Sequence, residues 1–297
     1  METLTMRTTL LFIFSILLTS HVYAAWEIKA DFETGAVGDT AQLPNTDAFH
    51  DTAKDSKYAD SPALSGSQSG SVTVKQGENG FSNWGGSFKF PTNLKEGDNI
   101  WFRVNVYYPK GWDFSCSCSQ GMKFMRIHTA SSSGLNEGYH STLIKGGTTG
   151  GLITVDTEVE GSEFKLNNAG PDFNNDQRQN LGTPAPRDRW ITYEMQIKLH
   201  STSGKGIYRV WQDGNLIFED LKTATLRSPT SISDFVYLYT YWNNGAPVTQ
   251  TSYVDDIVVT STVPGKKDAS GNSYIGVGAS IYISIPNPPT LVTAISK

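Results

Sequence analysis

The sequence predicts an all-β protein, a two-sheet β-sandwich with a concave substrate groove. About a dozen short runs alternate between apolar and polar side chains with a period of two, and turn residues separate them. The chain contains 28 Gly, 13 Tyr and 7 Trp, a composition that suits strands joined by many turns. After the first 24 residues no segment of useful length has the period of a helix, which excludes an α/β fold.

The expected strands follow one another from residue 30 to residue 260. They lie at residues 30–33, 71–74, 84–90, 99–108, 121–128, 139–144, 190–199, 208–211, 216–218, 235–242 and 253–260. Asp213-Gly214 between two of them is a hairpin signal. The acidic run at 154–165 alternates only weakly, and residues 167–189 are expected to form a long loop of the kind that often carries function.

The strand at residues 99–108 has two contrasting faces. Its apolar face predicts burial in the core and carries Ile100, Phe102, Val104, Val106 and Tyr108. Its other face is polar and aromatic and carries Trp101, Arg103, Asn105 and Tyr107. Because an aromatic ring can stack on the apolar face of a sugar, this second face is a candidate carbohydrate surface.

The strand at residues 121–128 gathers positive charge in a chain whose net charge is −5. Strict alternation places Arg126 and His128 on one face and Lys123 on the opposite one. A β-bulge after Gly121 would turn Lys123 to the face of Arg126. Three basic groups together predict an anionic partner, which is either a substrate or a neighbouring carboxylate.

Two further strands add candidate side chains. Alternation puts Tyr237, Tyr239 and Tyr241 on one face of the strand at 235–242, which is too many tyrosines for an ordinary solvent face. His140 lies on the strand that follows His128. An imidazole is a ready proton acceptor, since its unperturbed pKa is about 6.5.

Residues 1–24 are predicted to be a signal peptide. Arg7 precedes an apolar run at 10–18 that is too short to span a bilayer, and Val22-Tyr23-Ala24 fits the cleavage rule. We therefore expect a secreted or periplasmic protein that does not insert into a membrane after cleavage. One catalytic domain is expected at 25–262, followed by a Gly-, Ser- and Pro-rich tail or linker at 263–297.

Charge and cysteine content narrow the partners. The negative net charge argues against a nucleic-acid partner, because phosphate binding favours a basic surface. Cys116 and Cys118 are separated by one residue, and in an oxidising compartment they form either a local bridge or two thiols. They are too few to build a metal site by themselves. We expect a monomer.

Five segments between Asp31 and Thr260 carry a resemblance to a known group. They are Trp101-Phe102-Arg103-Val104 with Tyr107-Tyr108-Pro109, Lys123-Phe124-Met125-Arg126, Arg189-Trp190-Ile191-Thr192-Tyr193-Glu194, Val210-Trp211-Gln212-Asp213-Gly214 and Tyr253-Val254-Asp255-Asp256-Ile257. These segments resemble the concanavalin A-like jelly-roll polysaccharide lyases, which include heparin lyase I-like, glucuronan and ulvan lyases. The resemblance implies a jelly roll, a fold that also carries lectins, hydrolases and binding modules.

The resemblance also implies a reaction. A lyase of this group would cleave an ulvan-, glucuronan- or alginate-like polysaccharide beside a uronic acid by β-elimination, without an organic cofactor. A cation must neutralise the uronate carboxylate, a base must remove the proton at C5, and an acid must protonate the departing oxygen at C4. The implied catalytic candidates are Lys123, His128, His140, Tyr239 and Tyr241. The implied substrate-binding candidates are Arg103, Asn105, Tyr107, Arg126, Tyr237 and Asn243.

Two other functions remain open at this point. A binding module without catalysis would need the aromatic side chains but not the basic residues. A retaining glycoside hydrolase would use Glu158 and Glu163, because the run from Glu158 to Glu163 has nearly the carboxylate spacing that retaining jelly-roll glucanases carry.

Four carboxylates bracket the expected domain. Asp31 and Glu33 lie near its first strand, and Asp255 and Asp256 lie near its last strand. Since terminal strands often pair in jelly rolls, these oxygen ligands would either hold a structural Ca²⁺ or face solvent.

Overall fold

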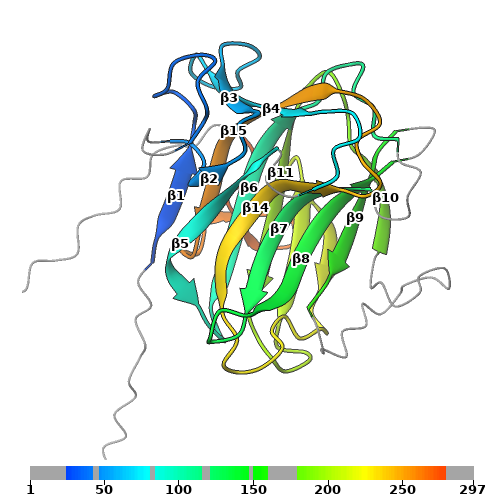
Figure 1. The fold of residues 1–297 in the computed structure, drawn as a ribbon. Helices are drawn as coiled ribbons and strands as arrows, with labels where there is room; N and C mark the ends of the chain where they lie inside the picture. Colours follow the sequence, from blue (N-terminus) through cyan, green and yellow to red (C-terminus); the bar gives the residue numbers. More distant parts are fainter. Residues whose placement is uncertain are drawn as a thin grey trace, which may run out of the picture.

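The computed structural model describes residues 25–42, 47–80, 84–115, 121–146, 150–159 and 179–278. In these residues all regular structure is strand, and two large antiparallel sheets pack as a sandwich (Figure 1), which confirms the predicted all-β class. The predicted signal peptide lies outside the described residues, as do Cys116, Cys118, Glu160 and Glu163.

The first sheet follows the order β13-β12-β11-β6-β15-β4-β3, and β1 pairs with β15. Its strands are β1 (Glu27–Ala30), β3 (Ser56–Ala59), β4 (Ser69–Val74), β6 (Asn99–Tyr107), β11 (Trp190–Lys198), β12 (Ile207–Gln212), β13 (Asn215–Asp220) and β15 (Gln250–Thr260). The first and last strands of the predicted domain therefore pair, as jelly-roll topology leads one to expect.

The second sheet follows the order β10-β9-β8-β7-β14-β5-β2. Its strands are β2 (Asp51–Thr52), β5 (Gly86–Leu94), β7 (Met122–Ala130), β8 (Asn136–Lys145), β9 (Leu152–Thr157), β10 (Gln179–Pro184) and β14 (Ser233–Trp242). Figure 1 shows β5, β14, β7, β8 and β9 side by side. This sheet carries the basic strand, β7, at its centre.

The core lies between the two sheets. The apolar face of β6 is fully buried there, as its alternation predicts. Across the sandwich, the ring of Phe124 on β7 packs edge-on against Tyr193 on β11, with their centroids 5.2 Å apart. The hydroxyl of Tyr239 on β14 donates a hydrogen bond of 3.0 Å to the Tyr108 hydroxyl, at the end of β6. Side chains that point away from this core form the two outer faces.

The polar face of β6 does not join β7, because the two strands belong to different sheets. Arg103 and Asn105 lie buried on the outer face of the first sheet. Arg103 donates to the backbone oxygens of Asp256 and Gly276, and the Tyr107 hydroxyl donates to Asp188. The expectation that these three residues share a groove with Arg126 is therefore corrected.

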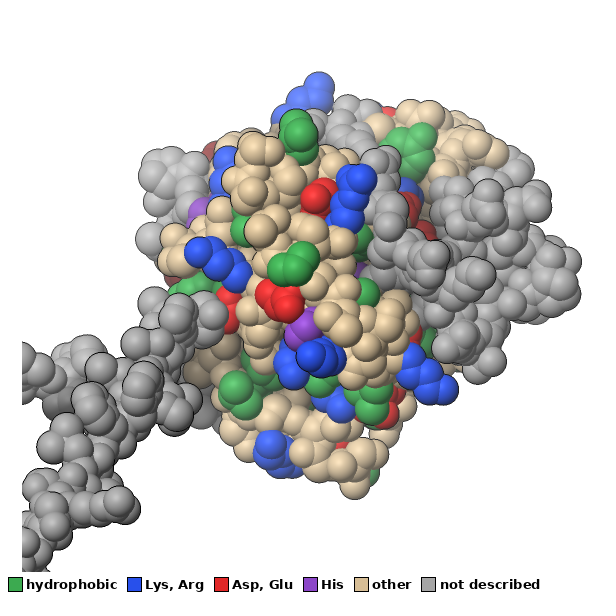
Figure 2. All heavy atoms as spheres, turned by 90° about the horizontal axis from the view of Figure 1, so that it is seen from below, with side chains coloured by type: hydrophobic (Ala, Val, Ile, Leu, Met, Phe, Trp, Pro, Cys, Tyr) green, Lys and Arg blue, Asp and Glu red, His purple; other side chains and the backbone are tan. Residues whose placement is uncertain are grey.

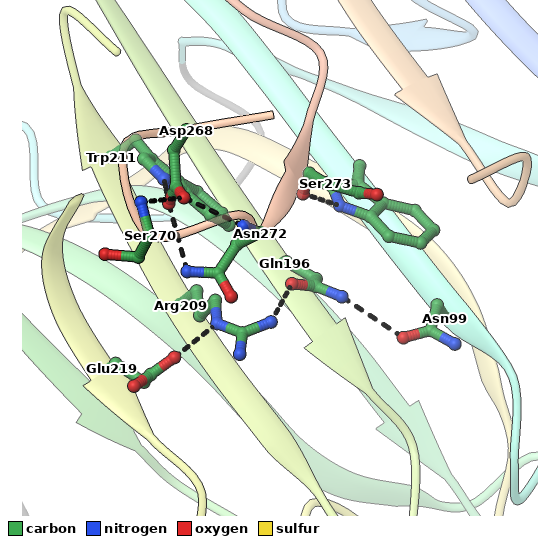
Figure 3. Close-up of polar contacts among 10 residues, drawn as sticks. Asn99, Gln196, Arg209, Trp211, Glu219, Asp268, Ser270, Asn272 and Ser273 are labelled. Atoms are coloured by element: carbon green, nitrogen blue, oxygen red, sulfur yellow. Dashed lines mark hydrogen bonds and ion pairs between the residues drawn. The ribbon is translucent and has the colours of Figure 1, made fainter. Parts of the chain in front are cut away.

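A hairpin covers part of this outer face. It consists of β16 (Lys266–Lys267) and β17 (Ser273–Tyr274), which lie in the predicted tail. Trp101 donates to the backbone oxygen of Ser273, and the Trp211 indole donates to Asp268, as Figure 3 shows. The carboxylate of Glu194 accepts the backbone N–H groups of Ile275 and Gly276. Residues 266–276 thus belong to the packed structure.

Beside the hairpin, polar side chains bond to one another across four strands of the first sheet. Gln196 donates to Asn99 and accepts from Arg209, and Arg209 forms an ion pair of 2.6 Å with Glu219 (Figure 3). These four side chains therefore satisfy one another. At the end of the sandwich drawn in Figure 2, cationic and anionic side chains are interspersed.

Within the described residues no helix is long and apolar enough to cross a membrane.

Candidate active site

The outer face of the second sheet gathers the basic strand, tyrosines and carboxylates. Three rows of paired residues cross it. The middle row runs Asp51–Ser87–Tyr237–Arg126–Ser141–Asp156, and the flanking rows are Lys89–Phe235–His128–Tyr139 and Tyr241–Lys123–Leu143–Thr154. We call Lys123, Arg126 and His128 the basic cluster.

A bulge brings Lys123 onto this face. The register of β7 against β8 shifts between Lys123 and Met125, so Phe124 and Met125 both enter the core. Lys123 and Arg126 then point the same way. The bulge follows Gly121, whose φ of 72° suits glycine and where an added Cβ would lie 2.4 Å from the Ile144 oxygen. The bulge that the sequence analysis required for Lys123 to share a face with Arg126 is therefore present. Strict alternation does not hold in this strand.

A matching irregularity in β14 removes Tyr239 from the face. The pairing of β14 with β7 shifts between Leu238 and Tyr241, and Tyr239 adopts a φ of 54°. Its ring is fully buried and stacks on Trp84 at 5.1 Å. Tyr237 and Tyr241 remain outside, so the prediction of three tyrosines on one face is corrected to two.

Glu158 connects the two cations of β7. Its carboxylate forms an ion pair of 2.5 Å with the Lys123 ammonium and a second, very short one with the Arg126 guanidinium. Arg126 also donates to the Ser141 hydroxyl at 3.1 Å, and its guanidinium carbon lies 3.6 Å from the centre of the Tyr139 ring. Only 1% of the Arg126 side chain is exposed, so Glu158 lies on the solvent side of the pair.

Electrostatics set the Lys123 and tyrosine pKa values in different directions. Burial, and then the charge of Arg126, lower the pKa of Lys123, while Glu158 opposes this shift. Burial raises the pKa of Tyr139 to about 12, although Arg126 acts against it. Burial and then the charge of Asp51 raise the pKa of Tyr237. The Tyr241 ring centre lies 5.7 Å from the Lys123 nitrogen, so these two side chains form the most direct pair for proton transfer.

Both ring nitrogens of His128 contact oxygen atoms. Nδ1 lies 2.6 Å from Asp234, and Nε2 lies 3.1 Å from the side-chain oxygen of Asn136. That amide oxygen also accepts the Gly138 N–H, which fixes the orientation of the amide. The ring also stacks on Phe235, with the two centroids 4.1 Å apart. Because both ring nitrogens are already engaged by neighbouring side chains, His128 is not placed as the base of this site.

His140 lies on the opposite side of β8, in the core. Its Nε2 contacts the backbone oxygen of Thr225 at 2.8 Å, and its Nδ1 contacts the Thr157 hydroxyl at 3.2 Å. Complete burial lowers its pKa to about 4, which keeps the ring neutral. Its expected place on the groove is corrected, because the even-numbered residues of β8 face inward. Asn243 follows β14, where its backbone N–H donates to the Gly121 oxygen.

Three of the four carboxylates considered as calcium ligands accept backbone N–H groups. Glu33 accepts the N–H groups of Ser67 and Gln68, and Asp255 accepts those of Leu64 and Ser65. Asp31 accepts the N–H of Glu33, and Asp256 adopts a φ of 45° beside Arg103. In the described part of the chain no three His, Cys, Asp or Glu residues come together as metal ligands.

Several contributors to this site were not selected from the sequence. They are Tyr139, Ser141, Asp234 and Asp51, and Glu158 in its role as a partner of Lys123 and Arg126. Tyr139 and Ser141 could have been found by choosing the other face of the His140 strand. The remaining carboxylates come from distant parts of the chain, and only the pairing of the strands brings them together.

A family described as polysaccharide lyase matches residues 35–258 of the chain. No curated protein matches it in sequence.

Solved structures with the same fold include enzymes that act on acidic polysaccharides. An alginate lyase from a Chlorella virus is 17% identical, with a TM-score of 0.53 over 70% of this chain and 90% of that one. The alginate lyase Aly36B, solved with an alginate trisaccharide, is 11% identical, with a TM-score of 0.54 over 80% and 98%. A glucuronan lyase from the fungus Trichoderma reesei is 15% identical, with a TM-score of 0.51 over 75% and 94%. At these identities the likeness concerns the fold.

Proposed function

The chain belongs to the polysaccharide lyase family, and on that premise we propose that it cleaves a uronate-containing polysaccharide by β-elimination at the basic cluster. The observation that carries the proposal is the Glu158 carboxylate, held at once by Lys123 and Arg126. A uronate presents the same chemical group. The substrate carboxylate would take the place of Glu158 at the Arg126 guanidinium, which would neutralise it and so acidify the proton at C5. Lys123 would lose its proton when Glu158 is displaced.

Lys123 is the proposed base. Its pKa is lowered by burial and by Arg126, so the neutral amine is accessible at a milder pH than for a free lysine. When the substrate carboxylate has taken the place of Glu158, the amine lies beside the carbon that bears the carboxylate. His128, whose two ring nitrogens already contact Asp234 and Asn136, lies on the same face and is not the proposed base.

Tyr241 is the proposed acid, because its ring centre lies 5.7 Å from the Lys123 nitrogen on this face. It would donate its phenol proton to the departing oxygen at C4. Tyr139 and Tyr237 border the cluster, and their raised pKa values keep both phenols protonated for hydrogen bonds to sugar hydroxyls. The hydrolase alternative lacks this support, since Glu158 is engaged by two cations.

The first test separates base chemistry from charge. Lys123→Ala is expected to lower kcat by about 10²–10⁴-fold on a uronate polymer, the usual contribution of a general base. Lys123→Arg is expected to be equally slow but to retain more of the substrate affinity, because a guanidinium keeps its charge and cannot lose its proton. Turnover is measured by the ultraviolet absorbance of the C4–C5 double bond in the new chain end.

Lys57→Ala provides the matched control, since Lys57 is an exposed lysine on β3 in the other sheet. A Lys123→Arg variant with the turnover of the wild type would contradict the base assignment. If no uronate polymer gives an unsaturated chain end, the lyase reaction on uronates is excluded. Binding of polymers without any cleavage would then favour the non-catalytic alternative.

The polymer and the location of the protein are parts of the same proposal. Ulvan, glucuronan and alginate all contain the required uronate, and the family match supports each of them equally. Export through the leader at 1–24 would bring the enzyme to such polymers outside the cell. N-terminal sequencing of protein recovered from the medium or the periplasm would test this, with Ala25 expected as the first residue.

A further inference from the structure

A pocket opens on the second sheet next to the basic cluster. It is a shallow hollow with about 390 Å³ of empty space, a figure that includes open solvent. Asp51, Trp84, Gly85, Tyr237 and Thr240 are among its lining residues. None of these residues has a role in the proton transfers proposed above.

The middle row of paired residues places Tyr237 one strand and Asp51 three strands from Arg126. Tyr237 pairs with Arg126 on one side and with Ser87 on the other, and Ser87 pairs with Asp51. Adjacent strands are about 4.8 Å apart. A polysaccharide that crosses the strands with its uronate at the basic cluster therefore presents a neighbouring sugar to this pocket.

The polar groups of the pocket suit hydroxyls. The Asp51 carboxylate is exposed on its rim and accepts hydrogen bonds. Tyr237 is half-buried and offers an aromatic ring and a phenol hydroxyl to the pocket. Trp84 and Tyr239 line it from the core, where both rings are buried.

The same carboxylate disfavours a second anion. The nearest cation along β5 is Lys89, which lies two residues beyond Ser87 and does not line the pocket. A uronate or a sulfate bound here would meet the charge of Asp51 without a compensating cation, whereas sugar hydroxyls could donate to it. Positive charge on this face is concentrated on the single strand β7. Measured across the strands, it therefore covers about the width of one sugar.

We propose that this pocket binds an uncharged sugar unit, and that the substrate is a heteropolymer whose cleaved uronate has a neutral, unsulfated neighbour. The inference rests on the proposed lyase function and narrows it. It distinguishes this chain from an enzyme adapted to a homopolymer of uronates, in which every binding position receives a carboxylate. Asp51 is the residue that sets this preference.

The test compares two polymers, one with a uronate at every position and one that alternates uronate with a neutral hexose. The wild type is expected to have the higher kcat/KM on the alternating polymer. Asp51→Lys is expected to reduce the ratio of the two values by at least about fivefold, mainly through KM, because it replaces repulsion by attraction at the pocket. Asp51→Asn should have a smaller effect in the same direction. Asp39→Asn, an exposed carboxylate in the 36–39 turn, is the matched control.

The two proposals fail in different ways. Cleavage of both polymers with a ratio that Asp51→Lys leaves unchanged overturns the neutral-sugar pocket and leaves the lyase function intact. If neither polymer is cleaved, the lyase proposal fails, and the pocket is judged by retention of the protein in affinity gels that contain each polymer. Preferential retention by the alternating polymer that Asp51→Lys abolishes supports the pocket, and equal retention overturns it.

Discussion

Glu158 is a single residue whose contacts define the state of the whole site. An anion held by Lys123 and Arg126 keeps both cations in place before substrate arrives. Removal of one partner from a buried charge pair leaves the other uncompensated, which is costly. The uronate carboxylate avoids this cost, because it replaces one carboxylate by another. Substrate binding is thus an exchange of anions.

Glu158→Gln is expected to lower KM several-fold, because the substrate carboxylate no longer competes with an internal one. The charge of Glu158 also raises the pKa of Lys123, so its removal should lower that pKa. Activity that depends on neutral Lys123 would then begin to rise at a lower pH. The measurement is the pH profile of kcat/KM, followed by the unsaturated product. An acidic limb that stays in place, together with an unchanged KM, would count against the exchange of anions.

Removal of the Tyr239 hydroxyl tests whether this residue belongs to the core and not to the outer face of the second sheet. Tyr239→Phe removes its 3.0 Å hydrogen bond to Tyr108 and leaves the outer face untouched. The variant should lose about 1 kcal/mol in the free energy of unfolding, the usual net value of a hydrogen bond, and should keep its turnover. Tyr241→Phe is the matched comparison and should show the reverse pattern. Denaturant unfolding and product absorbance measure the two effects.

At the scale of strands, alternation predicted which side chains of β6 enter the core, because a regular strand turns successive residues to opposite faces. It did not predict the bulges at Phe124 and Tyr239. A bulge inserts one residue without an obvious sequence signal, and every later side chain then changes face. The bulge in β14 brings the backbone oxygen of Tyr239 so close to Gly85 that a Cβ at this position would lie 2.0 Å from it. Gly85 is therefore a trace of this bulge in the sequence.

The partners of each strand were less predictable than its faces. β6 and β7 follow each other in the sequence and belong to opposite sheets, so Arg103 and Arg126 lie on different outer faces. The periodicity of a sequence does not predict which sheet a strand joins. Three of the predicted site residues that the structure brings together, Arg126, Tyr241 and Lys123 with its bulge, share one strand pair, β7 with β14. Residues contributed by other strands, such as Glu158 and Asp51, became visible only with the sheet order.

At the scale of the whole molecule, composition and periodicity were sufficient for the two-sheet class, because nearly every strand signal was local. The tail was harder to interpret. Its Gly and Ser content is typical of a linker, yet residues 266–276 satisfy buried groups of the first sheet, including Arg103 and Glu194. The composition of a segment predicts its local conformation, whereas these contacts depend on the outer face of the first sheet, on which the segment packs.

Two buried carboxylates make the stability of the whole protein depend on pH. Burial raises the pKa of Glu194 from 4.5 to about 7 and that of Asp255 from 3.8 to about 7. At a pH between the ordinary pKa of each group and its raised pKa, the carboxyl is protonated in the folded protein and ionised in the unfolded chain. The contribution of both groups to the free energy of unfolding therefore falls as the pH rises from about 4 to about 7, and it is constant above that range. His140, with its pKa lowered to about 4, acts in the opposite sense up to its ordinary value of 6.5.

Variants separate these opposing effects. Glu194→Gln and Asp255→Asn each remove one titrating group and keep the shape and one acceptor oxygen. Each is expected to lose stability at about pH 5, because a backbone N–H loses a good acceptor, and to recover part of that loss at about pH 8, where the wild type carries the buried charge. The measurement is the difference in Tm between variant and wild type across this range. A difference that stays constant with pH would show that these carboxylates ionise as readily in the folded protein as in the unfolded chain.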